Sequence, residues 1–410
     1  MMRRTIHKPV CRFWAEMMTA AVLLCAILCM MSCGNAGDVT GNPAEDTEPL
    51  TSFALDGTVP DQEMDLSYAQ GFRIFYYPDG ARLLHLERGG DYLLPGEETG
   101  RTLPSETVSG HEITVLPARP SELYLAASSV MALMRSIGAM DQIRYTGIEE
   151  DHWTLEEPVE AMRSGRLLFA GKYSAPDYEL LRKGHCDLAI ESSMIWHAPE
   201  VKEQLERLGI PVFIDYSSYE GDPRGRLEWV RLYGELTGTQ AQAEAFFTRQ
   251  LEDINAVLAL SGTDRTAAVF AIDSAGRVVV RRSSDYIPRL IAMAGGTYVP
   301  ENLAGDPESG SGSVILTMEQ FYEDCRDADI LIYNATYTAA PQSVAELVRQ
   351  QPMLAQFRAV QNGQVYAADG SFYQATDSTA GIVRDLHAIF NGDAGEPEWF
   401  HALPSEKEAG

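Results

Sequence analysis

Residues Gly171–Trp229 run GKYSAPDYELLRKGHCDLAIESSMIWHAPEVKEQLERLGIPVFIDYSSYEGDPRGRLEW. Two short apolar runs in this stretch, Asp187–Ile190 and Ile210–Ile214, flank a helical pattern that begins at Pro199 and ends at Gly209. Because β-branched residues favour strands and Pro and Gly mark element boundaries, we expect a strand, a helix and a second strand. This alternation is typical of a parallel α/β unit.

Each of the two predicted strands is followed by a loop of polar and aromatic residues. Ligands of a parallel sheet bind beyond the carboxyl ends of its strands, so these loops are the first candidates for a binding site. The loop residues are Ser192, Ser193, Trp196 and His197 after the first strand, and Asp215, Tyr216, Tyr219, Glu220 and Arg226 after the second.

Four runs support a family resemblance: GKYSAPDYE (171–179), DLAIESSMIWH (187–197), GIPVFIDYSSYE (209–220) and GRLEW (225–229). In this order they resemble the iron-complex class of ABC-transporter substrate-binding proteins, which captures siderophores, haem and corrinoids. The resemblance extends from about Ile113 to Phe390. It implies the helical-backbone periplasmic binding protein fold, an α/β fold with two Rossmann-like lobes joined by a long spanning α-helix. It also implies ABC permease and ATPase subunits as partners.

The N-terminus has the pattern of a secreted, lipid-anchored protein. Basic residues precede an apolar run from Met17 to Met31, which is too short for a transmembrane helix of about twenty residues. Ser32 and Cys33 follow in a pattern similar to a bacterial lipobox. We therefore expect residues 1–32 to be a lipoprotein signal peptide and Cys33 to be the lipidated N-terminus, outside the cytoplasm. An ordinary signal peptide with an incidental cysteine is the alternative.

Charge and length limit the class of protein. The chain has 59 acidic against 32 basic residues and a net charge of −27, which disfavours a nucleic-acid partner. A chain of 410 residues exceeds the size of a single hydrophobic core, so we expect two domains. We also expect the protein to be a monomer. The predicted division is a tether (33–56), an N-terminal α/β lobe (57–238), an interlobe helix (239–261), a C-terminal α/β lobe (262–395) and a tail (396–410).

Several elements outside the central stretch can also be predicted. Apolar alternation around Pro78-Asp79-Gly80 predicts a β-hairpin that enters the first lobe. Amphipathic periodicity predicts a helix over Ser121–Ile137. A second apolar stripe, over Gln240–Leu260, fits the rigid interlobe helix that the resemblance implies. Such a helix predicts small closure motions rather than a wide hinge.

The candidate ligand-binding residues are aromatic, cationic and polar groups on loops of both lobes. Arginines such as Arg226 and Arg282 can hold carboxylates bidentately, and aromatic rings can stack on a macrocycle. Relatives tend to have His where Asp222 stands, so the resemblance does not extend to a metal ligand there. The full set is Trp153, Tyr173, His197, Tyr219, Glu220, Arg226, Arg282, Tyr286 and Asn334.

Two glutamates are candidates for docking to a permease. In the family that the chain resembles, one glutamate of each lobe binds arginines of the membrane permease, and the matching positions are Glu179 and Glu319. A favourable interaction with a helix macrodipole is the structural alternative for Glu179.

The sequence contains no catalytic or metal-binding motif that we recognise. Only Cys186 and Cys325 lie in the predicted folded part, in different lobes, so we expect neither a disulfide nor a zinc site. We therefore expect a non-enzymatic protein without a cofactor, whose ligand is an iron chelate, haem or a corrinoid. Two alternatives remain open: an enzyme that uses Glu220, His197 or Asp222 as acid–base groups, and a ligand-free scaffold or adhesion lipoprotein.

Overall fold

The computed structural model describes residues 49–96, 107–108, 111–301, 303, 312–335, 340–393 and 395–405. The predicted signal peptide and the lipidation site at Cys33 lie outside these residues. Within them, no helix combines the length and the apolar composition needed to cross a membrane.

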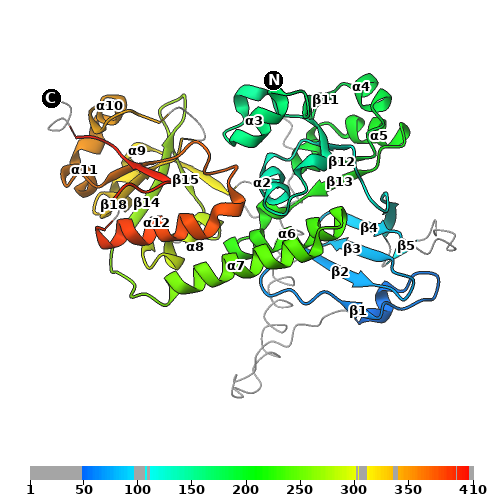
Figure 1. Ribbon diagram of the computed structural model, residues 1–410. Helices are drawn as coiled ribbons and strands as arrows, with labels where there is room; N and C mark the ends of the chain where they lie inside the picture. Colours follow the sequence, from blue (N-terminus) through cyan, green and yellow to red (C-terminus); the bar gives the residue numbers. More distant parts are fainter. Residues whose placement is uncertain are drawn as a thin grey trace, which may run out of the picture. The chain divides into compact units, whose positions relative to one another are not determined.

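The described part of the chain forms three main sheets (Figure 1). The first, which we call the N-terminal sheet, has the strand order β1-β2-β3-β4-β6-β5. Its strands are β1 (Gln62–Glu63), β2 (Phe72–Tyr76), β3 (Arg82–Leu86), β4 (Gly90–Leu94), β5 (Thr107–Val108) and β6 (His111–Val115). The predicted hairpin is thus confirmed as β2–β3, but it belongs to this additional sheet rather than to the parallel sheet of the first lobe.

The second sheet is parallel throughout and has the order β13-β12-β7-β8-β9. Its strands are β7 (Leu123–Leu125), β8 (Ile143–Thr146), β9 (Leu168–Phe169), β12 (Leu188–Ser192) and β13 (Val212–Asp215). Helix α5 (Pro199–Arg207) connects β12 to β13, as the sequence predicts. Helices α2 (Ser128–Ser136), α3 (Glu156–Arg163) and α4 (Tyr178–Lys183) complete this lobe, with the short pair β10 (Gly171–Lys172) and β11 (Ala175–Pro176).

The predicted helix over Ser121–Ile137 is wrong in its first half. Leu123–Leu125 forms the strand β7, which pairs with both β12 and β8, and α2 begins only at Ser128. All three residues of β7 are fully buried. Because a short apolar run has no periodicity of its own, pairing in the centre of a sheet decides its conformation.

The third sheet has the order β17-β15-β14-β18-β19-β20, and β16 pairs with β14. Its strands are β14 (Thr266–Ile272), β15 (Val278–Arg281), β16 (Thr297–Tyr298), β17 (Ser313–Leu316), β18 (Ile330–Tyr333), β19 (Val365–Ala368) and β20 (Phe400–Ala402). The helices of this lobe are α8 (Tyr286–Met293), α9 (Met318–Cys325), α10 (Val344–Gln350), α11 (Arg358–Gln361) and α12 (Thr379–Asn391).

Two predicted boundaries need correction. Phe400–Ala402 pairs with β19, and Trp399 and Phe400 are buried, so the predicted tail is part of the second lobe at least to Pro404. The predicted tether ends earlier than residue 56, because Phe53 is fully buried and its ring stacks on that of Phe75 at 4.0 Å. In both places a few aromatic residues in a polar segment bury their rings in a core formed by distant parts of the chain. The local sequence has no periodicity that predicts this burial.

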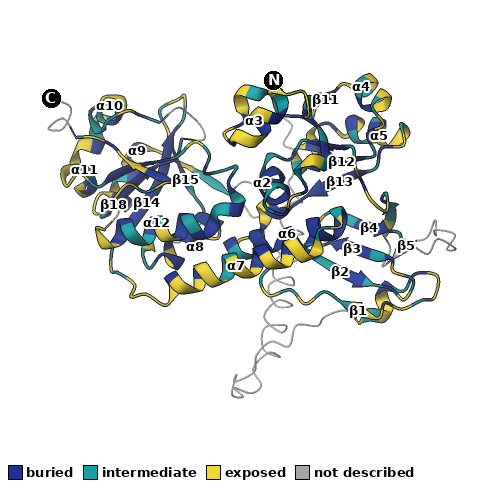
Figure 2. Ribbon diagram, viewed as in Figure 1, coloured by how far each residue is buried: buried dark blue, intermediate teal, exposed yellow. Residues whose placement is uncertain are grey.

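Helices α6 (Pro223–Thr237) and α7 (Gln240–Leu258) meet at Gly238, whose φ of 74° ends α6 in the left-handed conformation. Helix α7 packs on α6 along the first lobe and on α12 of the second. Figure 2 shows one face of α7 buried and the other exposed. Phe246, Phe247 and Ile254 lie on its buried face, which agrees with the apolar stripe of the sequence.

Candidate functional site

A cavity of about 290 Å³ lies where three loops of the chain meet. The first loop follows β13, the second follows β15 in the other lobe, and the third is the turn between β3 and β4 of the N-terminal sheet; Gly312, just before β17, completes the lining. Loops at the ends of strands can hold polar side chains without breaking the sheets beneath them. The lining residues are Arg88, Ser218, Tyr219, Glu220, Gly221, Arg282, Ser284, Asp285, Tyr286 and Gly312.

Two further cavities adjoin the first and share Glu220 and Gly221 with it. One of about 590 Å³ extends toward α8 and is lined by Tyr68, Gln70 and Arg289 among others. The other, of about 320 Å³, lies against Gln70, Arg88 and Tyr216 among others. We call the three cavities together the cleft. Both lobes and the N-terminal sheet contribute residues to its lining.

Arg226 links the two lobes at the cleft. Its guanidinium carbon lies 3.7 Å from the centre of the Tyr286 ring, and its Nη2 donates a hydrogen bond of 2.7 Å to the carbonyl of Ser218. Such a cation–π contact holds the planar guanidinium against the ring. Burial raises the pKa of the Tyr286 phenol above its usual value, so the ring stays neutral at physiological pH.

Glu220 is held by the protein rather than left open to a ligand. Its carboxylate accepts hydrogen bonds from the backbone N–H groups of Gln70 and Gly71, at 3.0 and 2.8 Å, and from Nε1 of Trp229 at 3.0 Å. The residue is only 7% exposed. Glu220 therefore positions the segment before β2. It lines the cleft, but its carboxylate is already bound by protein groups.

Asp222 forms the N-cap of α6 by accepting a hydrogen bond from the backbone N–H of Arg224 at 2.9 Å. Its carboxylate also forms an ion pair of 2.7 Å with the Arg224 guanidinium. Partial burial acts to raise the pKa of Asp222, but the hydrogen bonds and charge of Arg224 outweigh it and hold the pKa below its usual value. An aspartate that stays ionised in this way is a poor general acid.

The structure brings together five of the nine predicted ligand-binding residues. Tyr219, Glu220, Arg282 and Tyr286 line the cleft, and Arg226 lies beside it. The other four are not among the lining residues. Trp153 and Asn334 are 5% and 3% exposed, Tyr173 lies half-buried in the turn between β10 and β11, and His197 is exposed at the end of a 3-10 helix.

Several cleft residues were not predicted from the sequence, among them Tyr68, Gln70 and Arg88. All three belong to the N-terminal sheet or to the segment before β2. Arg88 stands before Gly89 and Gly90, a pattern that predicts a turn but not which part of the molecule the turn faces. The guanidinium of Arg88 lies 5.3 Å from the centre of the Tyr219 ring.

The two predicted docking glutamates occupy equivalent positions in the two lobes. Glu179 lies in the first turn of α4, and Glu319 lies in the first turn of α9, which Thr317 and Gln320 close with a capping box. Both glutamates are exposed. Glu179 forms an ion pair with Lys183 at 2.5 Å, an exposed pair that contributes little to stability.

Among the described residues, the group whose carboxylate and imidazole atoms come close enough to hold a metal ion is Glu149, Asp151 and His152. It lies in the loop after β8 and is not part of the cleft lining. The Lys172 ammonium forms an ion pair with Glu149 at 3.4 Å, which already offsets part of its charge. Cys186 and Cys325 are both buried and form no disulfide with each other, as predicted.

Comparison with known proteins agrees with this architecture. A family model described as "Periplasmic binding protein" matches residues 149–371. An uncharacterised lipoprotein of Methanocaldococcus jannaschii is 20% identical, and the alignment covers 92% of this chain and 91% of that protein.

Solved structures of low sequence identity share the fold. The periplasmic haem-binding protein HutB of Vibrio cholerae is 20% identical with a TM-score of 0.53, covering 65% of this chain and 98% of its own. A periplasmic haem-binding protein of Pseudomonas aeruginosa is 17% identical with a TM-score of 0.53, covering 70% and 99%. A protein of an Fe3+-hydroxamate transport system of Saccharomonospora viridis is 20% identical with a TM-score of 0.51, covering 66% and 93%.

Proposed function

Since the chain belongs to the periplasmic binding protein family, we propose that it captures an iron complex or a corrinoid and delivers it to an ABC importer. The observation that carries the proposal is the cleft itself, to which the first lobe contributes Tyr219, the second lobe Arg282 and Tyr286, and the N-terminal sheet Arg88. In this proposal Cys33 is lipidated after removal of residues 1–32 and anchors the protein outside the cytoplasm. The ligand is bound without covalent change.

The chemistry of the cleft suits a large ligand with aromatic and anionic groups. Arg282 and Arg88 can donate charge-assisted hydrogen bonds to carboxylate or catecholate oxygens, and Tyr219 offers a ring 39% exposed for stacking. Haem and a ferric hydroxamate system appear in the names of the structural relatives, so these ligand classes belong in the test. The acid–base alternative loses support, because Glu220 is held by N–H groups and the pKa of Asp222 is lowered. Its third candidate, His197, is exposed and is not among the cleft residues.

Thermal denaturation of the protein with haem, cobalamin, a ferric tricatecholate and a ferric trihydroxamate tests the proposal. A ligand that binds only the folded state at a hundredfold excess over Kd stabilises it by about 2.7 kcal/mol. We expect one class to raise the denaturation midpoint, while the metal-free chelators serve as controls. A folded protein that responds to none of the four would contradict the proposal and favour a scaffold or adhesion role.

The docking role of Glu179 and Glu319 gives a separate prediction. A double variant with Glu179→Arg and Glu319→Arg should bind its ligand as the native chain does but support little uptake, because like charges would face the permease arginines. Uptake of the labelled complex is measured in cells in which the variant replaces the native protein. Glu203→Arg, an exposed change on α5, is the matched control and should leave uptake intact. Normal uptake by the double variant would exclude the docking role.

A further inference from the structure

The N-terminal sheet precedes the segment 149–371 that the family model matches. One of its faces shares a continuous apolar core with the first lobe, to which Phe72, Leu84 and Tyr92 belong. Burial of that face means that the sheet is fixed to the lobe rather than tethered to it. Its loops consequently have a defined position relative to the cleft.

A second set of contacts fixes the segment Ser67–Gly71, which leads into β2 and which we call the strap. The Glu228 carboxylate accepts hydrogen bonds of 2.7 to 2.9 Å from the backbone N–H groups of Ser67, Tyr68 and Ala69. The Glu220 carboxylate accepts hydrogen bonds from the backbone N–H groups of Gln70 and Gly71. A carboxylate that accepts several N–H groups restrains the backbone strongly, so the side chains of the strap are held at the cleft wall.

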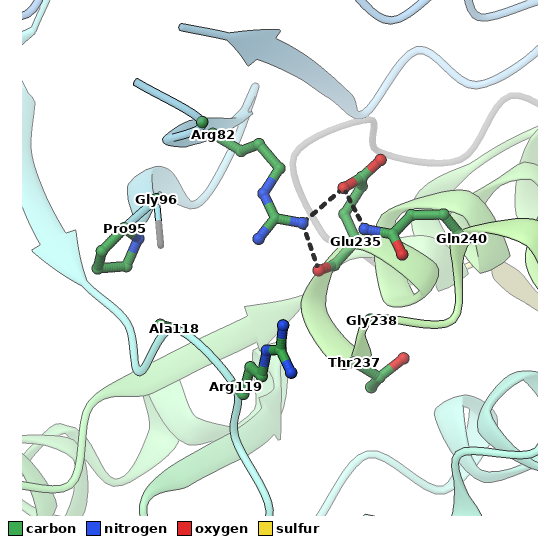
Figure 3. A pocket seen from close by; sticks show the side chains of 10 residues that line it. Arg82, Pro95, Gly96, Ala118, Arg119, Glu235, Thr237, Gly238 and Gln240 are labelled. Atoms are coloured by element: carbon green, nitrogen blue, oxygen red, sulfur yellow. Dashed lines mark hydrogen bonds and ion pairs between the residues drawn. The ribbon is translucent and has the colours of Figure 1, made fainter. Parts of the chain in front are cut away.

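The start of strand β3, in the interior of the sheet, is also attached to the helices (Figure 3). Arg82 of β3 forms an ion pair of 2.8 Å with Glu235 near the end of α6, and Gln240 of α7 donates to the same carboxylate at 3.0 Å. Glu235 is nearly buried, which strengthens the pair relative to one in solvent. The sheet is therefore held at both ends of α6.

The turn between β3 and β4 is the part of this sheet that reaches the cleft. It packs closely on the loop after β13: a Cβ atom at Gly89 would lie 3.0 Å from the Tyr216 ring. Arg88 in the same turn is exposed, and its guanidinium lies over the Tyr219 ring. It lines the same cavity as Arg282 of the opposite lobe.

We infer that the N-terminal sheet is a third part of the ligand site, in which Arg88 faces Arg282 across an iron chelate of net negative charge. The two carboxylates in the same lining are engaged by the protein: Glu220 accepts hydrogen bonds from backbone N–H groups of the strap, and Asp285 caps α8 and pairs with Arg281 at 3.8 Å. In a chain of net charge −27, the guanidinium groups of Arg88 and Arg282 are the charged groups that this cavity can present to an anionic ligand. A catecholate or carboxylate chelate has the charge and the oxygen acceptors that this site requires. The inference rests on the proposed function and narrows its ligand class.

Calorimetric titration of the native chain and of Arg88→Ala and Arg88→Glu variants tests the inference. The probes are an anionic ferric tricatecholate and a cationic ferric trihydroxamate. We expect Arg88→Ala to weaken binding of the tricatecholate by about tenfold and Arg88→Glu to weaken it further, with unchanged denaturation midpoints. Arg163→Ala, an exposed arginine of α3 outside the cleft, is the control and should bind as the native chain does.

The outcomes separate the inference from the proposed function. If the native chain binds either complex, or haem or cobalamin in the same titration, and Arg88→Ala binds it equally well, the inference is overturned and the proposed function stands. A preference of the native chain for the cationic trihydroxamate would also overturn it. If the native chain binds no member of the panel, the proposed function fails and the inference falls with it.

Discussion

A Glu228→Ala variant is expected to lose about 3–5 kcal/mol of unfolding free energy relative to the native chain. The Glu228 carboxylate is fully buried, accepts three backbone N–H groups of the strap and forms an ion pair with Arg231 at 3.2 Å. Its removal takes the acceptor from three backbone N–H groups of the partly buried strap and leaves the Arg231 guanidinium without its buried partner. Hydrogen bonds to a charged group contribute more than neutral ones, so the combined loss is large.

Urea denaturation at neutral pH measures the loss of stability in Glu228→Ala. Glu244→Ala is the matched control, because Glu244 pairs with the same Arg231 at 2.9 Å but its side chain is 58% exposed. We expect the control to change stability by less than about 1 kcal/mol. Similar small losses in both variants would show that the strap is not held by the Glu228 carboxylate.

A Glu191→Gln variant should be more stable than the native chain at pH 8, by about 3–5 kcal/mol. Glu191 lies in β12 with no exposed surface, and neither carboxylate oxygen has a hydrogen-bond partner among the described residues. Burial alone raises the pKa of Glu191 to about 8, so the folded protein holds this proton when the unfolded chain has released it.

The sign of the pH dependence follows from that pKa. Between the usual pKa of a glutamate and about 8, the folded state binds more protons at Glu191 than the unfolded state, so native stability falls as pH rises. Above about 8 this contribution is constant. Denaturation of the native chain and of Glu191→Gln at pH 5, 6, 7 and 8 should give a widening difference, whereas Glu203→Gln should track the native chain. A constant difference would contradict the assignment.

The elements that were predicted correctly are those whose own residues have a clear apolar pattern and boundary residues such as proline and glycine. Strand β12, helix α5 and strand β13 have short apolar runs, a proline at the helix start and a glycine beyond its end. Helix α7 has an apolar stripe along its length, and Gly238 separates it from α6. Periodicity and boundary residues are sufficient here because the local preference and the tertiary packing agree.

The failures share a different cause, which is dependence on distant partners. Leu123–Leu125 is a strand only because β8 and β12 lie on either side of it. Phe400–Ala402 becomes β20 by pairing with β19. Neither segment contains a pattern that identifies its neighbour.

The candidate site shows the same limit. Tyr219 follows β13 of the parallel sheet, where the sequence predicts ligand contacts. Arg282 and Tyr286 also line the cleft, but they follow β15, which is antiparallel to both of its neighbours. Arg88 lies in the cleft because the N-terminal sheet shares an apolar core with the first lobe. The strap, which lies some 150 to 160 residues from Glu220 and Glu228 in sequence, adds hydrogen bonds to their carboxylates. Contacts between residues so far apart in sequence could not be predicted from local patterns and were found only in the three-dimensional structure.

The central claim is that the cleft binds one metal complex through side chains of both lobes, among them Arg282 in its lining and Arg226 beside it. The most direct measurement is calorimetric titration of the native chain and of an Arg226→Ala, Arg282→Ala double variant with the complex that gives the largest thermal shift. We predict one complex per native chain and at least about hundredfold weaker binding to the double variant, which keeps its fold. Absence of saturable binding to the native chain, or equal affinity of the double variant, would contradict the claim.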